Sequence, residues 1–94
     1  MVSIYRALLG HFGPDTQLSK LSEECLELGC DALHYRDGKI DVVKLAEEVA
    51  DVEIMCGQIR ELIGHPVVNN AKVAKLERSI ARYLKPASPA TTPV

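Results

Sequence analysis

Two short acidic motifs contain the residues of this chain whose types and spacing could do chemistry. The motifs are Glu23-Glu24-Cys25-Leu26-Glu27 and Glu47-Glu48-Val49-Ala50-Asp51. Residues three apart are neighbours on one face of an α-helix, so each motif offers a pair of carboxylates on that face. Carboxylate oxygens suit a hard divalent cation, Mg²⁺ or Mn²⁺, better than Zn²⁺. The motifs therefore indicate a metal site shared by two helices.

The second motif lies within an apolar stripe. On a helical wheel, Glu48 and Asp51 fall between Leu45, Val52 and Met55. A buried, unpaired carboxylate costs several kcal/mol, so two of them on a core-facing stripe require cations or hydrogen-bond donors. One helix offers too few ligands for a hard cation, and crowding should raise the pKa of at least one carboxyl group. The predicted metal ligands are Glu24, Glu27, Glu48 and Asp51.

Other readings of the acidic residues remain open. Glutamate is a good helix former, and Lys20 with Glu24 has the spacing of an ordinary i,i+4 ion pair. A di-iron bundle would use Glu-x-x-His motifs, to which only Asp31-Ala-Leu-His34 comes near. The remaining glutamates of this kind are expected on solvated helix faces: Glu23, Glu47, Glu53 and Glu61.

Four helices must position these motifs, and apolar residues at helical spacing predict each of them. Gly13-Pro14 separates the first two helices, Asp41 is a suitable N-cap for the third, and Gly64 ends it before Pro66 begins the fourth. The pattern predicts an all-α helical bundle with the acidic motifs on its second and third helices. The expected helices are residues 4–12, about 16–35, 42–63 and 66–85.

Composition limits the class of protein. The chain has 94 residues, 47% of them hydrophobic, which fits one helical domain over residues 1–85 followed by a Pro-rich tail, residues 86–94, predicted to be disordered. A net charge of −2 argues against a nucleic-acid surface. No apolar run approaches the roughly 20 residues that a membrane span needs. The three cysteines form no Cys-x-x-Cys pair and follow no secretory leader, so we expect reduced core thiols in a cytoplasmic protein.

The order of the motifs resembles that of a known family. Glu-Glu-x-x-Glu, a spacer over residues 28–47, and Glu-x-x-Asp are similar to the signature of the MazG-like all-α nucleoside triphosphate pyrophosphohydrolases. Residues 17–22 and 72–78 also look like those of the short single-domain members, so the resemblance covers about residues 12–84.

The resemblance implies a function. The four carboxylates would hold Mg²⁺, and the reaction would cleave an NTP or dNTP between its α- and β-phosphates, giving the monophosphate and pyrophosphate. Glu24, or its neighbour Glu23, is the expected acceptor of the proton of the attacking water. A polyphosphate also needs cations besides the metal. The predicted substrate-binding residues are Gln17, for a base or sugar, with Lys20, Lys72 and Lys75.

The apolar stripes also bear on the assembly of the chain. Three substantial helices enclose too little volume to cover their apolar stripes and a nucleotide, so we expect a homodimer or homotetramer whose four-helix core is completed by self-association. The alternative function is a non-catalytic helical interaction module, in which an acidic docking face binds a basic segment of a partner.

Overall fold

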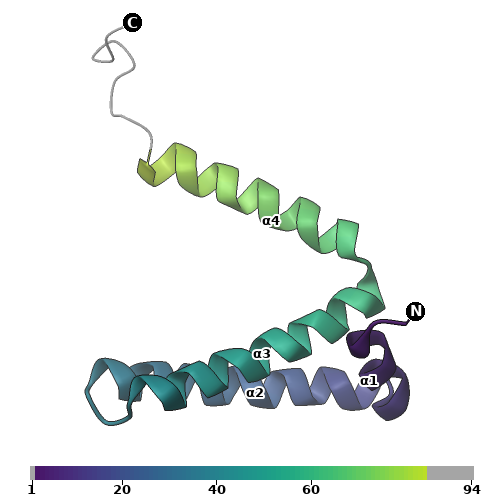
Figure 1. The fold of residues 1–94 in the computed structure, drawn as a ribbon. Helices are drawn as coiled ribbons and strands as arrows, with labels where there is room; N and C mark the ends of the chain where they lie inside the picture. Colours follow the sequence, from purple (N-terminus) through teal and green to yellow (C-terminus); the bar gives the residue numbers. More distant parts are fainter. Residues whose placement is uncertain (1, 85–94) are drawn as a thin grey trace, which may run out of the picture. The chain divides into compact units, whose positions relative to one another are not determined.

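All regular structure in the computed structural model, which describes residues 2–84, is helical (Figure 1). The all-α prediction is confirmed, and the helices lie close to their expected bounds. The predicted disorder of residues 86–94 concerns a segment outside the described residues. The elements are α1 (Ile4–Phe12), α2 (Pro14–Arg36), α3 (Val42–Ile63), α4 (His65–Ser79) and the π-helical turn η1 (Ile80–Leu84).

The chain divides into two compact units, Met1–Gly64 and His65–Val94. The acidic motifs both belong to the first unit, which contains α1, α2 and α3. The expectation of one helical domain over residues 1–85 stays a prediction.

Local sequence signals set the ends of the helices. Gly13 has a φ of 89°, which favours glycine, and it both ends α1 and begins α2, with Pro14 in the first helical turn. Asp41 caps α3, because its side chain accepts a hydrogen bond from the backbone N–H of Lys44 at 2.9 Å. Gly64 ends α3 with a φ of 103°. These caps place the start of each long helix, and therefore the register of each acidic motif.

α2 and α3 form an antiparallel hairpin, and they lie side by side along most of their length (Figure 1). The turn between them, residues 37–41, is short, and two helices joined by so short a turn pack antiparallel to each other. As a result, residues near the middle of α2 face residues near the middle of α3. The two acidic motifs lie in this middle stretch.

α1 is attached to α3 by polar and aromatic contacts. Arg6 binds Glu61 through an ion pair of 3.1 Å, and the Ser3 hydroxyl donates a hydrogen bond to the same carboxylate at 2.7 Å. The Tyr5 ring lies against Gly57, so close that a Cβ on that glycine would be 2.8 Å from the ring. The expectation that Glu61 is solvated was therefore wrong, because α1 returns across α3 and covers its side chain to 8% exposure. Glu23, Glu47 and Glu53 are exposed as expected.

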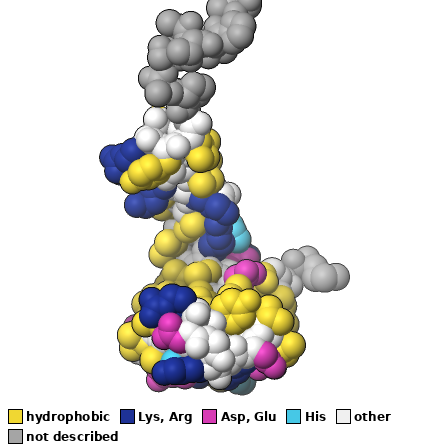
Figure 2. All heavy atoms as spheres, turned by 90° about the vertical axis from the view of Figure 1, so that its left-hand side faces the viewer, with side chains coloured by type: hydrophobic (Ala, Val, Ile, Leu, Met, Phe, Trp, Pro, Cys, Tyr) yellow, Lys and Arg dark blue, Asp and Glu magenta, His cyan; other side chains and the backbone are white. Residues whose placement is uncertain are grey.

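The interior of the first unit is unusually polar. Met55 is the one buried hydrophobic residue within residues 2–84, whereas four polar or charged residues are buried, Gln17, Glu24, Glu48 and Gln58. Large apolar side chains are exposed along both long helices, as at Leu26 (73%) and Val42 (63%), and Figure 2 shows hydrophobic side chains at the surface among charged ones. Several residues of the predicted apolar stripes, including Leu18, Val49 and Leu62, are exposed, so much of the predicted apolar surface stays uncovered in the single chain.

The cysteines follow the same pattern. Cys25, Cys30 and Cys56 are free thiols, and all are exposed. The expectation of core thiols was wrong, since all three side chains lie on exposed positions of α2 and α3.

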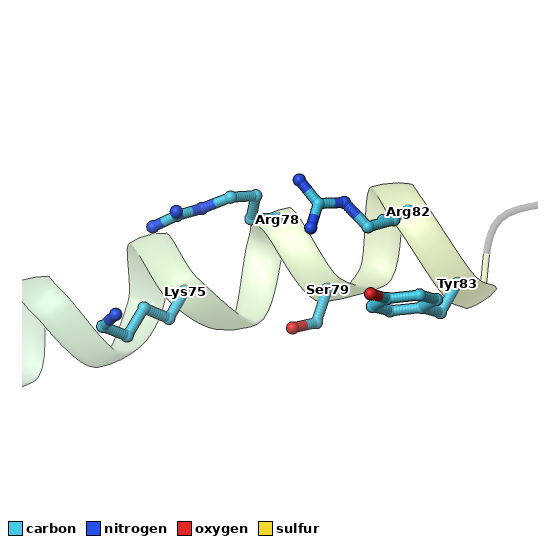
Figure 3. Close-up of a pocket in the computed structure, with 5 residues that line it drawn as sticks. All are labelled: Lys75, Arg78, Ser79, Arg82 and Tyr83. Atoms are coloured by element: carbon cyan, nitrogen blue, oxygen red, sulfur yellow. The ribbon is translucent and has the colours of Figure 1, made fainter.

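α4 and η1 carry the basic residues of the second unit. Lys75, Arg78 and Arg82 lie along one side of this helical segment with Ser79 and Tyr83, bounding a shallow hollow of about 310 Å³ (Figure 3). All of these residues are exposed. Among the helices that the structure describes, none is both long and apolar enough to cross a membrane.

The contact between Tyr5 and Gly57 gives a first prediction. Gly57→Ala should displace the ring and lower the free energy of unfolding by about 1–3 kcal/mol, the usual effect of overpacking. Gly29→Ala is the matched control, because a Cβ there meets nothing within 4 Å and alanine favours the helix by roughly 0.5–1 kcal/mol. Urea denaturation of both variants makes the comparison. Equal stability of the two would show that α1 does not pack against α3 as described.

Candidate metal centre

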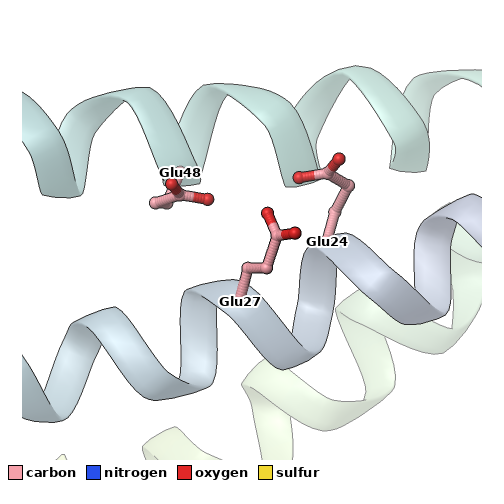
Figure 4. Close-up of side chains that lie close together, drawn as sticks. All are labelled: Glu24, Glu27 and Glu48. Atoms are coloured by element: carbon pink, nitrogen blue, oxygen red, sulfur yellow. The ribbon is translucent and has the colours of Figure 1, made fainter.

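Three carboxylates meet between α2 and α3. Glu24 and Glu27 come from α2 and Glu48 from α3, and Figure 4 shows their side chains directed toward one another across the space between the helices. One oxygen of each lies within 4.8 Å of the others. The antiparallel hairpin brings them together, since it sets the middle of one helix opposite the middle of the other.

Two of these carboxylates are buried and only half satisfied. Glu24 is 7% exposed and Glu48 is 5% exposed. The Oε2 atom of each is buried and has no hydrogen-bond partner within the described part of the chain. An unsatisfied buried polar atom costs about 1–3 kcal/mol, and more when it is charged. A cation bound beside these two oxygens and the third carboxylate would neutralise their charge and stabilise the folded chain.

The other oxygen of each buried carboxylate is held by a lysine. Lys20 Nζ lies 3.2 Å from Oε1 of Glu24, and Lys44 Nζ lies 2.8 Å from Oε1 of Glu48. These ion pairs, which are also hydrogen bonds, raise the pKa of both lysines, so both ammonium groups are charged. Lys20 is thus a partner of Glu24, the arrangement expected for an i,i+4 pair.

Glu27 is exposed and carries the clearest sign of crowding among the carboxylates. The pKa of its carboxyl group lies above the ordinary value of 4.5, first because of the negative charge of Glu24, then because of desolvation, and then because of Glu48. Lys20 acts weakly in the opposite direction. The expectation that crowding raises the pKa of at least one carboxyl group is confirmed at this residue.

The donor set and its dimensions fit a small divalent cation. Ligands at about 2.1 Å from Mg²⁺ put opposite oxygens about 4.2 Å apart. The three carboxylate oxygens, within 4.8 Å of one another, need only small rotations to reach that spacing. All three are hard oxygen donors, and none of the residues in the group is a cysteine or histidine, which favours Mg²⁺ or Mn²⁺ over Zn²⁺.

Asp51 lies apart from this group. It is exposed on α3, and the three residues whose oxygens meet are Glu24, Glu27 and Glu48. The expectation that Asp51 lies within the apolar stripe was wrong, because on the helical wheel it falls about 60° from Glu48, at the edge of the stripe. Its burial, expected from the stripe, is not seen in the single chain. Its role as a metal ligand stays a prediction.

A cavity of about 540 Å³ adjoins the carboxylates on the side of α1. Lys20 lines it and also pairs with Glu24, so the cavity and the carboxylate group share this side chain. Two buried glutamines lie in the wall: Gln17 Nε2 donates a hydrogen bond of 2.6 Å to Gln58 Oε1. Leu8, Phe12 and Met55 supply apolar surface. The cavity thus combines apolar walls with a fixed pair of amides.

Two residues of this region, Lys44 and Gln58, were not among the predicted site residues, and the spacing of Lys44 offered it only as a structural partner of Glu48. Lys44 repeats the spacing of Lys20, since Lys-Leu-x-Glu-Glu occurs at residues 20–24 and again at 44–48. Gln58, 2% exposed, lies three residues after Met55 on the stripe of α3. A polar residue on an apolar stripe was the signal that singled out Glu48, and the same argument applies to Gln58.

The other predicted residues lie elsewhere. Lys72 and Lys75 are exposed on α4, in the second unit, and their part in substrate binding stays a prediction. His34, considered for a di-iron site, pairs with Asp31 at 3.2 Å through its Nδ1 atom. Neither of these two residues belongs to the group of three carboxylates.

Comparison of the chain with protein-family models, with curated proteins and with solved structures gave no match.

The glutamine pair gives a second prediction. Gln58→Leu should lower the free energy of unfolding by about 1–3 kcal/mol, because the amide of Gln17 loses its buried partner. Replacing both glutamines by leucine should restore most of this loss, since no polar group is then left unpaired. Urea denaturation of the single and double variants gives the coupling between the two positions. Additive losses would contradict the hydrogen bond.

The raised pKa of Glu27 gives a third prediction, on pH dependence. The folded chain holds this proton more tightly than the unfolded chain, so the metal-free protein should lose stability as the pH rises from about 4.5 through the folded pKa. Above the folded pKa the loss is complete and constant. Glu27→Gln should therefore melt at a higher temperature than the original chain at neutral pH in chelator, and at nearly the same temperature in acid.

Glu53→Gln is the control for this comparison, since Glu53 is exposed on the same helix pair and lies outside the group of three. Its melting temperature should follow that of the original chain at every pH. If Glu27→Gln melts lower than the original chain in chelator at neutral pH, the carboxylates do not repel one another.

Proposed function

We propose that this chain is a Mg²⁺-dependent nucleoside triphosphate pyrophosphohydrolase of the MazG-like type, cleaving an NTP or dNTP to the monophosphate and pyrophosphate. The observation that carries the proposal is the pair of buried carboxylates, Glu24 and Glu48, each with one oxygen that has no partner in the described chain, beside Glu27. The step from a metal site to this reaction rests on the resemblance of the two acidic motifs to that family.

Burial weighs against the alternative of an acidic docking face. A docking face needs carboxylates that a partner's basic side chains can reach. Glu24 and Glu48 are at most 7% exposed, and their free oxygens have no contact with solvent, so a lysine or arginine of a partner cannot approach them. A small ion that enters between the helices can. The geometry therefore favours a metal over a peptide.

The adjoining cavity supports a nucleotide as the ligand. Its volume of about 540 Å³ lies in the usual range for small-molecule sites, roughly 300–1,000 Å³. Phe12 and Met55 offer apolar contact for a base, and Gln17, the residue predicted to bind a base or sugar, lines the same cavity. Lys20 lies where the cavity meets the carboxylates, which suits the first phosphate of a nucleotide.

The residues of the chain divide the chemistry between them. Glu24, Glu27 and Glu48 would hold Mg²⁺, with Asp51 as a further predicted ligand. When bound, Mg²⁺ neutralises phosphate charge and makes water more acidic. Glu24 is the proton acceptor that we propose, with the exposed neighbour Glu23, which lines the cavity, as the alternative.

The exposed apolar surface supports self-association as part of the proposal. Leu26, Val42 and Val49 are exposed on the two long helices, and one buried hydrophobic residue is a small core for a helical hairpin with α1. Many large apolar side chains exposed on the same two helices are typical of a surface that another chain covers. A homodimer or homotetramer that pairs the α2–α3 hairpins would bury it and complete a four-helix core.

The test is a panel of nucleoside triphosphates with Mg²⁺, in which pyrophosphate and free phosphate are both measured. We expect pyrophosphate with a nucleoside monophosphate. Glu27→Gln and Asp51→Asn should each lower turnover by more than about 100-fold, because an amide keeps the shape of the side chain and loses the charge that attracts the cation. Glu53→Gln is the matched control and should be as active as the original chain.

Near-normal turnover in both variants would remove the metal hypothesis. Loss in Glu27→Gln alone would take Asp51, the exposed residue, off the set of ligands. Release of free phosphate without pyrophosphate would keep a metal-dependent hydrolase and refute this reaction.

A further inference from the structure

Each of the two buried carboxylates is held by a lysine of its own helix. Lys20 lies four residues before Glu24 on α2, and Lys44 lies four residues before Glu48 on α3. In both pairs the ammonium group takes the Oε1 atom and leaves the buried Oε2 atom without a partner. Each of the two helices therefore contributes a lysine and glutamate pair with the same spacing to the carboxylate group.

The ammonium groups are positioned to move. Both lysine side chains are half exposed, at 50%. A lysine has a flexible stem of four carbons, so its ammonium group can leave a carboxylate for a nearby ligand while the helix stays in place. The carboxylates cannot follow, because Glu24 and Glu48 are buried between α2 and α3.

Charge connects the lysines with a cation at the same carboxylates. Glu24, Glu27 and Glu48 together with two ammonium groups keep a negative excess, which attracts a divalent cation. A cation bound to these carboxylates would repel the two ammonium groups, which lie within 3.2 Å of the same side chains. The repulsion weakens both ion pairs at once.

We propose that Lys20 and Lys44 are tethered counter-ions, which neutralise Glu24 and Glu48 in the metal-free protein and bind the oxygens of a phosphate ligand once a divalent cation occupies the carboxylates. The proposal rests on the proposed function in one respect, that the carboxylates bind such a cation. It assigns to Lys44 a ligand-binding role, and it makes the binding of metal and of phosphate mutually reinforcing.

A static role would have different consequences. If the lysines were only structural partners of the glutamates, their removal would leave buried charges and weaken the fold, and phosphate would not change the affinity for metal in the original chain or in the variants. If they are counter-ions that the cation must displace, their removal strengthens metal binding. It also abolishes the effect of phosphate, because the groups that join the two ligands are gone.

The experiment is isothermal titration of the full chain with Mn²⁺, without and with inorganic phosphate, and a protein-free titration corrects for Mn²⁺ bound by phosphate itself. The variants are Lys20→Met, Lys44→Met and the two together. For the original chain we expect phosphate to tighten Mn²⁺ binding by about fivefold or more, the lower end of usual couplings between sites. For the double variant we expect tighter Mn²⁺ binding without phosphate, and little further change when phosphate is added.

Two further variants are controls for the charge and for the position of the lysines. Lys20→Arg with Lys44→Arg retains both charges and should keep the coupling between phosphate and Mn²⁺, and Lys39→Met, in the turn before α3, should behave as the original chain. Circular dichroism establishes that each variant is folded, and the single methionine variants serve if the double variant is not. Metal affinity that falls or stays the same in the folded methionine variants would overturn the proposal.

The outcomes separate this inference from the proposed reaction. An original chain that does not bind Mn²⁺ would overturn both. Mn²⁺ binding with the expected behaviour of the lysine variants, but without hydrolysis of any triphosphate, would support the counter-ion role and refute the reaction. Hydrolysis with unchanged Mn²⁺ affinity in the methionine variants would refute the counter-ion role alone.

Discussion

Burial of two carboxylates between α2 and α3 is the constraint on which the rest of the first unit depends. A charge removed from water must find a counter-charge or hydrogen-bond donors nearby. Here the two lysines supply half of what Glu24 and Glu48 require, and the oxygens on the other side remain without a partner in the described chain. The centre of the helical hairpin is therefore an electrostatic arrangement in which packing has a small part.

The polar centre decides where the apolar residues lie. Positions that in an ordinary bundle would hold leucine or valine are taken by Glu24, Glu48 and the hydrogen-bonded pair Gln17 and Gln58, so Met55 is left as the buried hydrophobic residue of residues 2–84. The apolar side chains of both helices are then displaced to the surface. Such a hairpin has little hydrophobic stabilisation of its own. Contacts at the margin of the hairpin, including those of α1 with Glu61, therefore contribute a larger share of the stability of the fold.

In a site of this kind, the features that serve function lower the stability of the fold. The repulsion that raises the pKa of Glu27 destabilises the folded chain at neutral pH, yet the same negative excess is what would attract a divalent cation. The lysines moderate the conflict without removing it, since they neutralise one oxygen of each buried carboxylate and leave the other available. Binding of a cation would stabilise the fold by mass action.

The sequence by itself determined the helices and the position of each carboxylate along its own helix. Gly13, Asp41 and Gly64 end or begin helices through contacts within a few residues, and spacing within a helix follows from its fixed rise and turn, so local information was sufficient. Only the tertiary structure decided which side chains meet. Glu48 is buried beside Glu24 and Glu27 whereas Asp51 is exposed, Gln58 reaches Gln17, and α1 covers Glu61. These contacts depend on how two helices turn toward each other, and residues far apart in sequence set that angle together.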